Sequence, residues 1–508
     1  MDAIDLSIVV AYLLGILLCG LWVGRKTKSS EDYFVAGRKL PWYAIGASLY
    51  AANINAEHFV GALGTAYMMG IAMASYEWLA TFALIILAFL ILPFFLRSRV
   101  STSVEYLEKR FGPSSHLMLA VFVLIMNVIG YIPMYLYAGS LLTSQLLGIG
   151  IWEGVLLMAV LAGIYTTVGG LKSVVWTNLI QAVLITASGL FLLFFGLQAV
   201  GGWGTLRASL PDGFFHLVRP VSDPDMPWPG VFIGISIINV WYWCLNPNVT
   251  QSALGAKDSF NGKMGVLSAG FFKLLTPFLF IFPGLCAAIL YPGLPSPDLA
   301  GPTMISELLP VGVTGLFFAG FIASVMSSVA ATLQTTATII SNDVYRKYLR
   351  KSADDKKILW ISRITTFAVM VLGILFVAVV MRSESLFIYI QQVSAYITPG
   401  IVAVFLFGML WKDANAKGSF ATMTFGLVFG ISTWLGLIPV LSDMAYLHFC
   451  IILFAACCIF EVLACKLFRE KAKVVELYPA EEEKHRGALY ASAAIIAALT
   501  ILLYVIFG

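Results

Sequence analysis

Charged residues are scarce in this sequence. Asp, Glu, Lys and Arg make up only 11% of its 508 residues, whereas 60% of the residues are hydrophobic. The mean hydropathy is +0.91. A soluble protein of this length needs far more polar surface. The composition therefore excludes a soluble domain and predicts many membrane-spanning helices, each needing about 20 apolar residues.

The sequence also lacks the motifs of several enzyme classes. It contains no P-loop, no GxSxG elbow and no HExxH pair, which argues against ATP-driven transport and against hydrolysis. The seven cysteines lie in or at the ends of apolar runs and form neither CxxC nor a metal-ligand spacing, so we interpret them as packing residues. No charged leader with a small-residue cleavage site opens the chain, and the first apolar run is expected to be retained as a span. We expect no enzyme, no cofactor, no nucleic-acid partner and no obligatory protein partner.

Apolar runs alternate with short polar loops along the whole chain. About fourteen spans are predicted, with boundaries soft by a few residues. They lie at roughly 4–24, 42–69, 75–96, 115–147, 151–168, 174–199, 229–251, 264–291, 309–341, 360–381, 385–410, 418–438, 444–465 and 487–507.

The basic residues are distributed unevenly between the two sides that these spans define. The loops of one side hold 27 of the 31 Lys and Arg residues. The opposite side holds only Arg207, Arg219 and Arg382, and Lys273 falls inside a span. Because basic loops stay cytoplasmic, both termini are predicted to face the outside.

Two spans carry polar groups and helix breakers in their middle. The second span reads GASLYAANINAEHFVGALGTA, with Asn53, Glu57 and His58 at mid-membrane depth. The seventh reads INVWYWCLNPNVTQ, in which Pro247 should bend or break the helix. Polar groups at this depth are tolerated only where they line a cavity. Two interrupted helices five spans apart are the sequence pointer to an inverted-repeat transporter.

Further polar residues inside spans fit the same cavity. Glu77 opens the third span, Lys273 lies in GFFKLLTP and Gln391 lies in FIYIQQV. A buried Glu or Lys alone is costly, so pairing is expected. Two interpretations remain open here: a structural ion pair between Glu77 and Lys273, or a ligand site in which both charges also bind hydroxyls.

The ninth span contains a stripe of hydroxyl side chains. Ser324, Ser327, Ser328 and Thr332 share one helical face. Hydroxyl oxygens suit Na⁺, although Ser and Thr also bond to their own helix or to a neighbouring one.

These segments resemble the sodium/solute symporter family and, within it, the sodium/glucose cotransporter (SGLT-like) branch. The resemblance runs along nearly the whole chain and is carried by EDYFVAGRKLPWYAIGASLYAANINAEHF, SYEW, GGLKSVVWTNLIQ, YWCLNPN, FFKLLTPF, SSVAATL and TPGIVAVFLFGMLWK. It implies an all-α membrane protein with the LeuT-like fold, a five-plus-five inverted repeat surrounded by peripheral helices. The expected units are a peripheral N-terminal helix at 1–30, repeats at 42–200 and 229–411, and peripheral C-terminal helices at 416–508.

The resemblance also implies roles for individual residues. The sodium site would use backbone oxygens of Ala51, Ile54 and Ser324 and the hydroxyls of Ser327 and Ser328. The sugar site would comprise Asn53, His58, Glu77, Asn239, Tyr242, Trp243, Lys273 and Gln391. Tyr242 would be the inner aromatic gate, and Phe387 and Ala62 would take the outer-gate positions.

Two departures from the family pattern bear on coupling. Asn178 stands where the family usually has Asp, which removes a negative charge from the inner ion path. Val329, Ala330 and Ala331 follow Ser328 where members with a second sodium site place hydroxyls. We therefore expect one sodium per sugar, or loose coupling.

The sequence thus predicts a sodium-coupled symporter of a neutral sugar, such as glucose or galactose, in a plasma membrane or a bacterial inner membrane. Another polyhydroxy solute such as inositol, and a proton-coupled or uncoupled carrier, remain open. A sugar sensor is disfavoured because no loop is long enough for a signalling domain.

Overall fold

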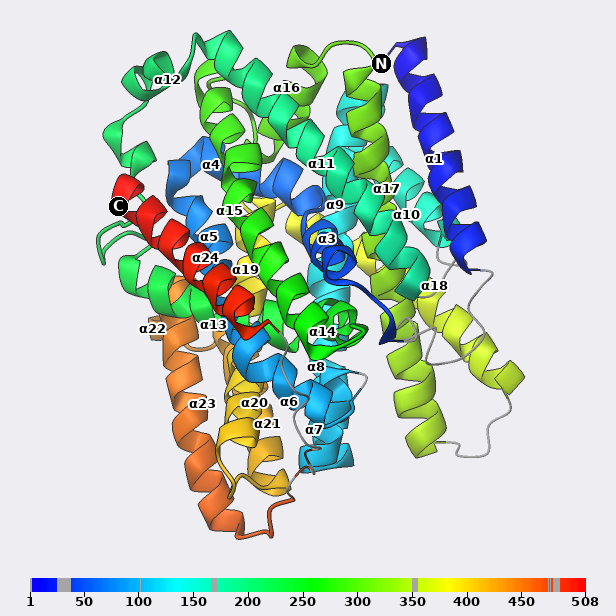
Figure 1. Ribbon diagram of the computed structural model, residues 1–508, viewed down its shortest axis with the longest axis vertical. Helices are drawn as coiled ribbons and strands as arrows, with labels where there is room; N and C mark the ends of the chain where they lie inside the picture. Colours follow the sequence, from blue (N-terminus) through cyan, green and yellow to red (C-terminus); the bar gives the residue numbers. More distant parts are fainter. Residues whose placement is uncertain are drawn as a thin grey trace.

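The fold is built from helices. The computed structural model describes residues 2–24, 38–100, 102–165, 171–349, 355–473, 475, 477 and 485–508 (Figure 1). The segment EDYFVAG at 31–37 and the basic residues Arg25, Lys26 and Lys28 lie outside the described residues. Within the described ranges, β structure is limited to two isolated bridges, Leu40 with Ala256 and Arg219 with Pro227.

Residues up to 254 form the first group of helices. In chain order they are α1 (Ala3–Gly24), α3 (Trp42–Asn53), η2 (Glu57–Ala62), α4 (Leu63–Met69), η3 (Gly70–Met73), α5 (Ala74–Ile86), η4 (Leu87–Ile91), α6 (Leu92–Arg97), α7 (Ser103–Phe111), α8 (Pro113–Ile125), η5 (Met126–Tyr131), α9 (Ile132–Leu147), α10 (Ile151–Tyr165), α11 (Leu171–Val200), α12 (Trp203–Ser209), η6 (Asp212–Phe215), η7 (Gly230–Gly234), α13 (Ile235–Asn239), η8 (Val240–Leu245) and α14 (Pro247–Leu254).

The remaining helices follow from residue 259. They are α15 (Ser259–Leu290), η9 (Pro297–Leu299), α16 (Ala300–Leu308), α17 (Val313–Thr338), η10 (Ile339–Leu349), α18 (Asp355–Val380), α19 (Leu386–Ile397), α20 (Pro399–Leu410), α21 (Ala416–Trp434), α22 (Pro439–Ser442), α23 (Tyr446–Phe468) and α24 (Arg486–Phe507). Each of the fourteen predicted apolar runs coincides with one of these helices or with consecutive ones. Eight helical segments in the described part are long and apolar enough to cross a membrane on their own.

Both predicted helix breaks are confirmed. Helix α3 ends at Asn53, and Ile54 adopts an extended conformation before the chain turns back into a helix. Helix η8 ends at Leu245, Asn246 is extended, and Pro247 opens α14 at a position where its missing N–H costs nothing. A third break was not predicted: α19 and α20 meet at Thr398–Pro399 with a bend of 50°.

Helix α15 lies at the centre of the bundle and packs closely on the first broken span. A Cβ added at Gly265 would lie 2.7 Å from the Ile45 side chain, and one at Gly284 would lie 2.4 Å from the carbonyl oxygen of Leu63. Small residues allow such close backbone approach between membrane helices. Helix α15 therefore holds both halves of the broken span, α3 and α4.

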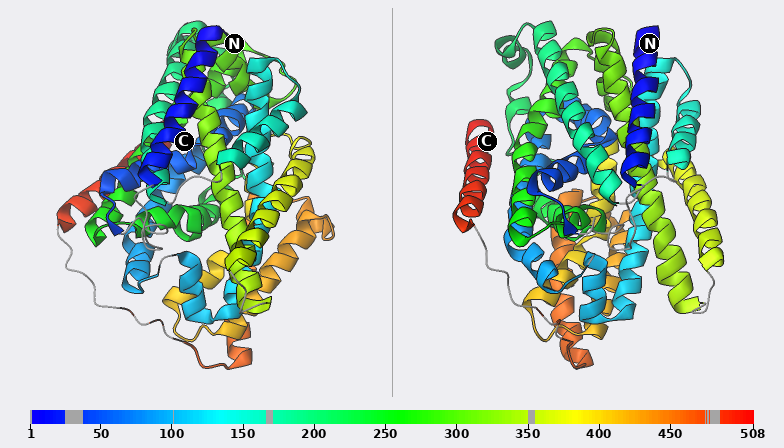
Figure 2. Two further views of the ribbon diagram at one scale, coloured as in Figure 1. Left: turned by 90° about the vertical axis from the view of Figure 1, so that its right-hand side faces the viewer. Right: turned by 45° about the vertical axis from the view of Figure 1, so that its right-hand side comes forward.

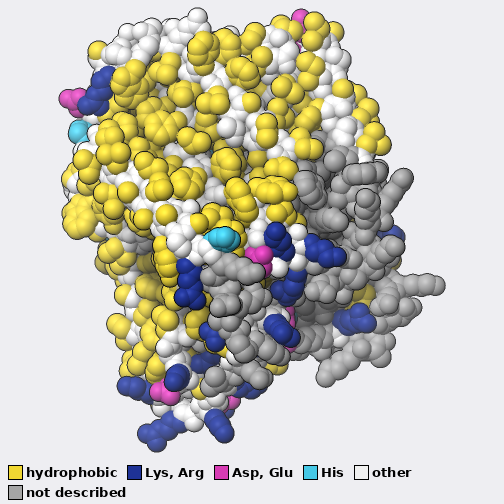
Figure 3. Space-filling view, viewed as in Figure 1, with side chains coloured by type: hydrophobic (Ala, Val, Ile, Leu, Met, Phe, Trp, Pro, Cys, Tyr) yellow, Lys and Arg dark blue, Asp and Glu magenta, His cyan; other side chains and the backbone are white. Residues whose placement is uncertain are grey.

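The outer surface is largely apolar, as lipid contact requires. Hydrophobic side chains cover most of the face in Figure 3, and Lys and Arg gather at its lower end. Figure 2 shows α24 on the outside of the bundle, far from α1. Helix α1 is attached by Asp5, whose carboxylate accepts hydrogen bonds from the backbone N–H groups of Gly312 and Gly315, at 2.7 and 2.9 Å. This carboxylate satisfies free N–H groups at the start of α17.

Candidate functional site

A central cavity of about 50 Å³ lies where the two broken spans meet α5, α15, η5 and α19. We call it the central cavity. It is lined by Asn53, Glu57, His58, Tyr76, Glu77, Tyr131, Ile238, Asn239, Tyr242, Trp243, Lys273, Phe387, Ile390, Gln391 and Ser394. All eight residues predicted for the sugar site are among them, as is the predicted gate residue Phe387. The structure thus brings together side chains that are up to 338 positions apart.

A cluster of charged and polar groups forms one wall of the central cavity. The Lys273 ammonium forms an ion pair with Glu77 and donates a hydrogen bond to Asn53 Oδ1. His58 Nε2 lies 3.2 Å from the other carboxylate oxygen of Glu77. Lys273 is 1% exposed, so each charge depends on its partner. The ion pair expected from the sequence is present, and it faces the cavity.

Aromatic rings form a second wall. Lys273 Nζ lies 5.3 Å from the centre of a Trp243 ring, within the range of a cation–π interaction. The Tyr242 and Trp243 rings meet edge to face at 5.2 Å. Rings next to hydrogen-bonding groups offer both an apolar face and polar edges to a ligand.

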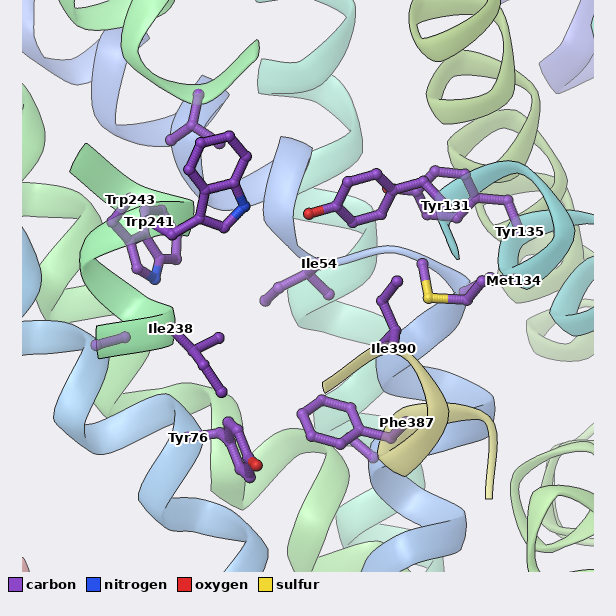
Figure 4. Close-up of a cluster of buried hydrophobic side chains, with 14 of the residues drawn as sticks. Ile54, Tyr76, Tyr131, Met134, Tyr135, Ile238, Trp241, Trp243, Phe387 and Ile390 are labelled. Atoms are coloured by element: carbon purple, nitrogen blue, oxygen red, sulfur yellow. The ribbon is translucent and has the colours of Figure 1, made fainter. Parts of the chain in front are cut away.

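A pair of aromatic rings lies on one side of the cavity. The rings of Tyr76 on α5 and Phe387 on α19 lie 5.0 Å apart, nearly perpendicular, and Figure 4 shows them pointing toward each other. Ala62, the other predicted outer-gate residue, does not line the cavity. It is buried in η2 next to Gly61, where an added Cβ would lie 3.0 Å from the backbone nitrogen of Phe387.

Several lining residues were not predicted as ligands. They are Glu57, Tyr76, Tyr131, Ile238, Ile390 and Ser394. Glu57 was recognised as an intramembrane polar residue, and Tyr76 is adjacent to Glu77, so proximity in sequence was the available signal. Three segments around the cavity, η2, η5 and η8, are π-helical. The wider turn of a π-helix rotates side chains away from the 3.6-residue period that sequence reasoning assumes.

The residues expected to bind sodium lie on α3 and α17. Ala51 and Ile54 are at the carboxyl end of α3, where the last carbonyl groups lack helical partners. Ser324 is buried, and Ser327 and Ser328 are half-buried. Within the described residues these three hydroxyls make no hydrogen bond. By contrast, Thr332 Oγ1 donates to the Ser328 carbonyl oxygen at 2.7 Å.

Aromatic packing joins α17 to the first broken span. The Phe59 ring on η2 meets the rings of Phe317 and Phe321 edge to face, at 4.7 and 6.0 Å. Ser324 follows Phe321 by about one helical turn. This packing holds the hydroxyl stripe of α17 on the side of the broken span.

Asn178 contacts both broken spans through serines. It is buried, and its Nδ2 donates to Ser48 Oγ on α3 at 3.4 Å. Ser48 Oγ in turn lies 3.5 Å from Ser252 Oγ on α14. Asn178 therefore contacts α3 at Ser48, about one helical turn before Ala51 and the break.

Two broken helices around a polar cavity within an apolar bundle define a secondary transporter. The chain belongs to the sodium:solute symporter family, whose model matches residues 33–426.

Named relatives agree with this family. The chain is 33% identical over 485 residues to the sodium/myo-inositol cotransporter 2 of Mus musculus, covering 88% of this chain and 71% of the relative. It is 34% identical over 459 residues to the sodium/glucose cotransporter of Vibrio parahaemolyticus, covering 84% of each. It is 31% identical over 535 residues to the sodium/glucose cotransporter 1 of Oryctolagus cuniculus, covering 94% and 80%.

Solved structures share the fold. A Na⁺-coupled sialic acid symporter in a substrate-bound outward-open state matches with a TM-score of 0.79 at 21% identity, covering 93% of this chain and 99% of that one. The nucleobase-cation-symport-1 family transporter Mhp1 matches with a TM-score of 0.53 at 14% identity, covering 92% and 100%. The chain therefore has the LeuT-like fold and is a multi-pass membrane symporter that uses sodium as its coupling ion.

Proposed function

We propose that this symporter carries a neutral sugar, a hexose such as glucose or galactose, with one sodium ion per sugar. The observation that supports this most directly is the cluster of Lys273, Glu77, His58 and Asn53 on one wall of the central cavity. It presents donors and acceptors together, and a sugar hydroxyl needs both. Hydrogen bonds to charged groups contribute about 1.5–3 kcal/mol each, so a few of them can select a polyol.

The other residues of the proposed sugar site complete this arrangement. Gln391 lines the cavity and has no hydrogen-bond partner among the described residues, so its amide can bind a hydroxyl. Asn239 Nδ2 donates to the Tyr76 carbonyl oxygen at 3.3 Å, which orients its amide. Tyr242 and Trp243 offer ring faces. Phe387, with Tyr76, would close the outer side.

Sodium would couple to this site through the break in the first broken span. Carbonyl oxygens of Ala51, Ile54 and Ser324 and the hydroxyls of Ser327 and Ser328 are the proposed ligands. The three serine hydroxyls form no hydrogen bond in the described structure, and this supports the proposal. Sodium bound here would favour the outward-open form, because an ion shifts only an equilibrium whose states it distinguishes. Asn53 lies between Ala51 and Ile54, so ordering the break would also order a sugar ligand.

The available energy is sufficient for accumulation. One charge moving through 100 mV releases about 2.3 kcal/mol, and a tenfold sodium gradient adds about 1.4 kcal/mol. A symporter with one sodium per sugar could therefore concentrate sugar on the order of several hundredfold.

The distribution of charge supports an orientation in the membrane. Lys and Arg gather at the lower end of the molecule in Figure 3, and the N-terminus lies at the opposite end in Figure 1. The positive-inside rule assigns the lower end to the cytoplasm of a plasma membrane or a bacterial inner membrane. We propose that both termini face the outside and that 42–200 and 229–411 are the two inverted repeats.

A second candidate solute is inositol. The similarity to a protein named sodium/myo-inositol cotransporter 2 favours it, and the same hydroxyl-binding groups serve a cyclitol. Proton-coupled or uncoupled sugar transport is a further alternative, because Asn178 leaves the inner ion path without a carboxylate.

Uptake into proteoliposomes tests these alternatives. Labelled glucose, galactose and myo-inositol are offered with an inward sodium gradient, with choline in its place, or with a pH gradient. We expect sodium-dependent accumulation of a hexose above equilibrium, and its loss in Ser328→Ala and Gln391→Ala. Accumulation of inositol alone would select the second candidate, and uptake that ignores sodium would contradict coupling.

A further inference from the structure

We propose that the central cavity prefers a sugar or cyclitol that carries a protonated amine, and that Glu57 binds this amine. The inference rests on the proposed function, because it assumes a polyhydroxy solute in this cavity. The solute would then carry an amine in addition to its hydroxyls. Glu57, which has no role in the family resemblance, would bind that amine.

The charged groups around the cavity do not balance. The lining contains two carboxylates, Glu57 and Glu77, and one ammonium, Lys273. Lys273 forms its ion pair with Glu77. The imidazole of His58 places Nε2 against Glu77, and its Nδ1 has no hydrogen-bond partner in the described part of the chain. With a neutral His58 and both carboxylates ionised, the lining carries one net negative charge, which Glu57 contributes.

The Glu57 carboxylate has no partner among the described residues. The backbone N–H of Glu57 donates to Asn55 Oδ1 at 2.9 Å, which fixes the first turn of η2 after the break. Its carboxylate forms neither a hydrogen bond nor an ion pair with any residue that the structure describes. Lys273 is already held by Glu77, by Asn53 and by the Trp243 ring. Among the residues that the structure describes, no other Lys or Arg lines the cavity to neutralise Glu57.

A carboxylate without a partner in a cavity favours a cationic ligand. An ionised carboxylate only accepts hydrogen bonds, and a partly buried one gains most from a cationic donor. The aromatic walls add to this preference, because the faces of Tyr131, Tyr242 and Trp243 attract cations. The same charge disfavours a sugar acid, since like charges repel in a site that is largely shielded from water. Glu57 therefore acts as a specificity-determining residue for the charge of the solute.

The test is competition against uptake of labelled glucose by the full chain in proteoliposomes with an inward sodium gradient. The competitors are unlabelled glucose, glucuronate and hexoses with an amine at carbon 2, 3 or 6. For at least one amino sugar we expect half-inhibition at a concentration about tenfold below that of glucose. Glucuronate should be the weakest competitor. In Glu57→Gln the amino sugar should lose its advantage, so that its ratio to glucose falls to about one.

A matched control is Glu105→Gln, which removes a carboxylate from the exposed surface of α7 and should keep the wild-type ratio. Equal competition by all amino sugars and glucose in the wild type would overturn the proposal, and this comparison does not require the variant to fold. A preference for the amine that survives in Glu57→Gln would overturn it as well. If no labelled sugar is taken up at all, the proposed function fails. Ligand-induced thermal stabilisation, measured with the same compounds, then tests the amine preference separately.

Discussion

The hydroxyl of Tyr76 lies 2.5 Å from the hydroxyl of Tyr446, and the two residues are 370 positions apart. Tyr76 lines the central cavity and contacts Phe387, whereas Tyr446 begins α23, one of the C-terminal helices. This hydrogen bond joins a peripheral helix to the wall of the cavity. The C-terminal part of the chain therefore positions a residue of the candidate site.

Replacing Tyr446 by Phe should weaken this link. The Tyr76 hydroxyl would remain buried without a partner, at a cost of about 1–3 kcal/mol. We expect a lower thermal unfolding temperature and a higher KM for the solute, because Tyr76 also holds the Phe387 ring. The measurements are thermal unfolding in detergent and initial uptake rates. Tyr490→Phe is the control, since Tyr490 is 60% exposed on α24. Equal behaviour of the two variants would contradict the role of Tyr446.

Breaking the buried ion pair between Lys273 and Glu77 should destabilise the protein. Lys273→Met alone leaves a buried carboxylate without its cation and should destabilise the protein by about 3–5 kcal/mol. Adding Glu77→Gln removes that charge and should restore part of the stability, although neither variant should transport. Thermal unfolding of the single and double variants measures the difference.

Lys109→Met provides the comparison for this pair. It breaks the exposed pair of Lys109 with Glu105, whose charged atoms lie 3.0 Å apart, and should cost less than about 1 kcal/mol. A double variant less stable than Lys273→Met would contradict the prediction, because it would show that the unpaired Glu77 charge is not the cause of the lost stability.

Asn178→Asp tests whether the missing carboxylate weakens coupling. Aspartate can accept a hydrogen bond from Ser48 Oγ, so the contact between α11 and α3 is retained while a negative charge is added near the break. We expect a lower sodium concentration for half-maximal uptake and a smaller sodium-independent leak. Asn178→Ala removes the contact without adding charge and serves as the comparison. If both variants change sodium dependence in the same direction, the charge is not the cause.

Asp298 should make the stability of the folded protein depend on pH. It lies in η9, between the eighth and ninth predicted spans, and both its carboxylate oxygens accept from the backbone N–H of Leu386, at 3.2 and 3.0 Å. Burial raises the pKa of Asp298 to about 7, against the opposing effect of the Leu386 hydrogen bond. The folded protein therefore holds this proton more tightly than the unfolded chain does.

The pKa of Asp298 is higher in the folded protein than in the unfolded chain. Protonation of Asp298 therefore stabilises the folded protein fully below the unfolded-state pKa, and this stability is lost as the pH rises through about 7. From about pH 5 to pH 8, the wild type should lose up to a few kcal/mol relative to Asp298→Asn. Thermal unfolding across this range measures the difference, with the exposed Asp413→Asn as the control. Parallel pH profiles for the wild type and Asp298→Asn would contradict the assignment.

Much of the architecture could be predicted because it depends on local composition. An apolar run of about 20 residues must become a helix in lipid, since every backbone group has to be paired internally. Pro247 cannot continue a helix from the preceding turn, and the polar run around Asn53 is intolerable against lipid. The apolar runs, the two breaks and the family could therefore be predicted from the sequence. The bend at Pro399 has the same cause, a proline inside a helix. It was not predicted, because the sequence indicates one uninterrupted apolar span at residues 385–410.

What the sequence by itself determined is which residues are too polar for lipid and therefore had to meet in a protected interior. Only the tertiary structure decided how those groups pair. Lys273 pairs with Glu77, so Glu57 has no cationic partner among the described residues, and Tyr446 contacts Tyr76 from a helix distant in sequence. Such pairings depend on helix rotation and on close packing at glycines such as Gly284. The π-helical turns at the cavity alter that rotation, and periodicity read along the chain cannot supply it.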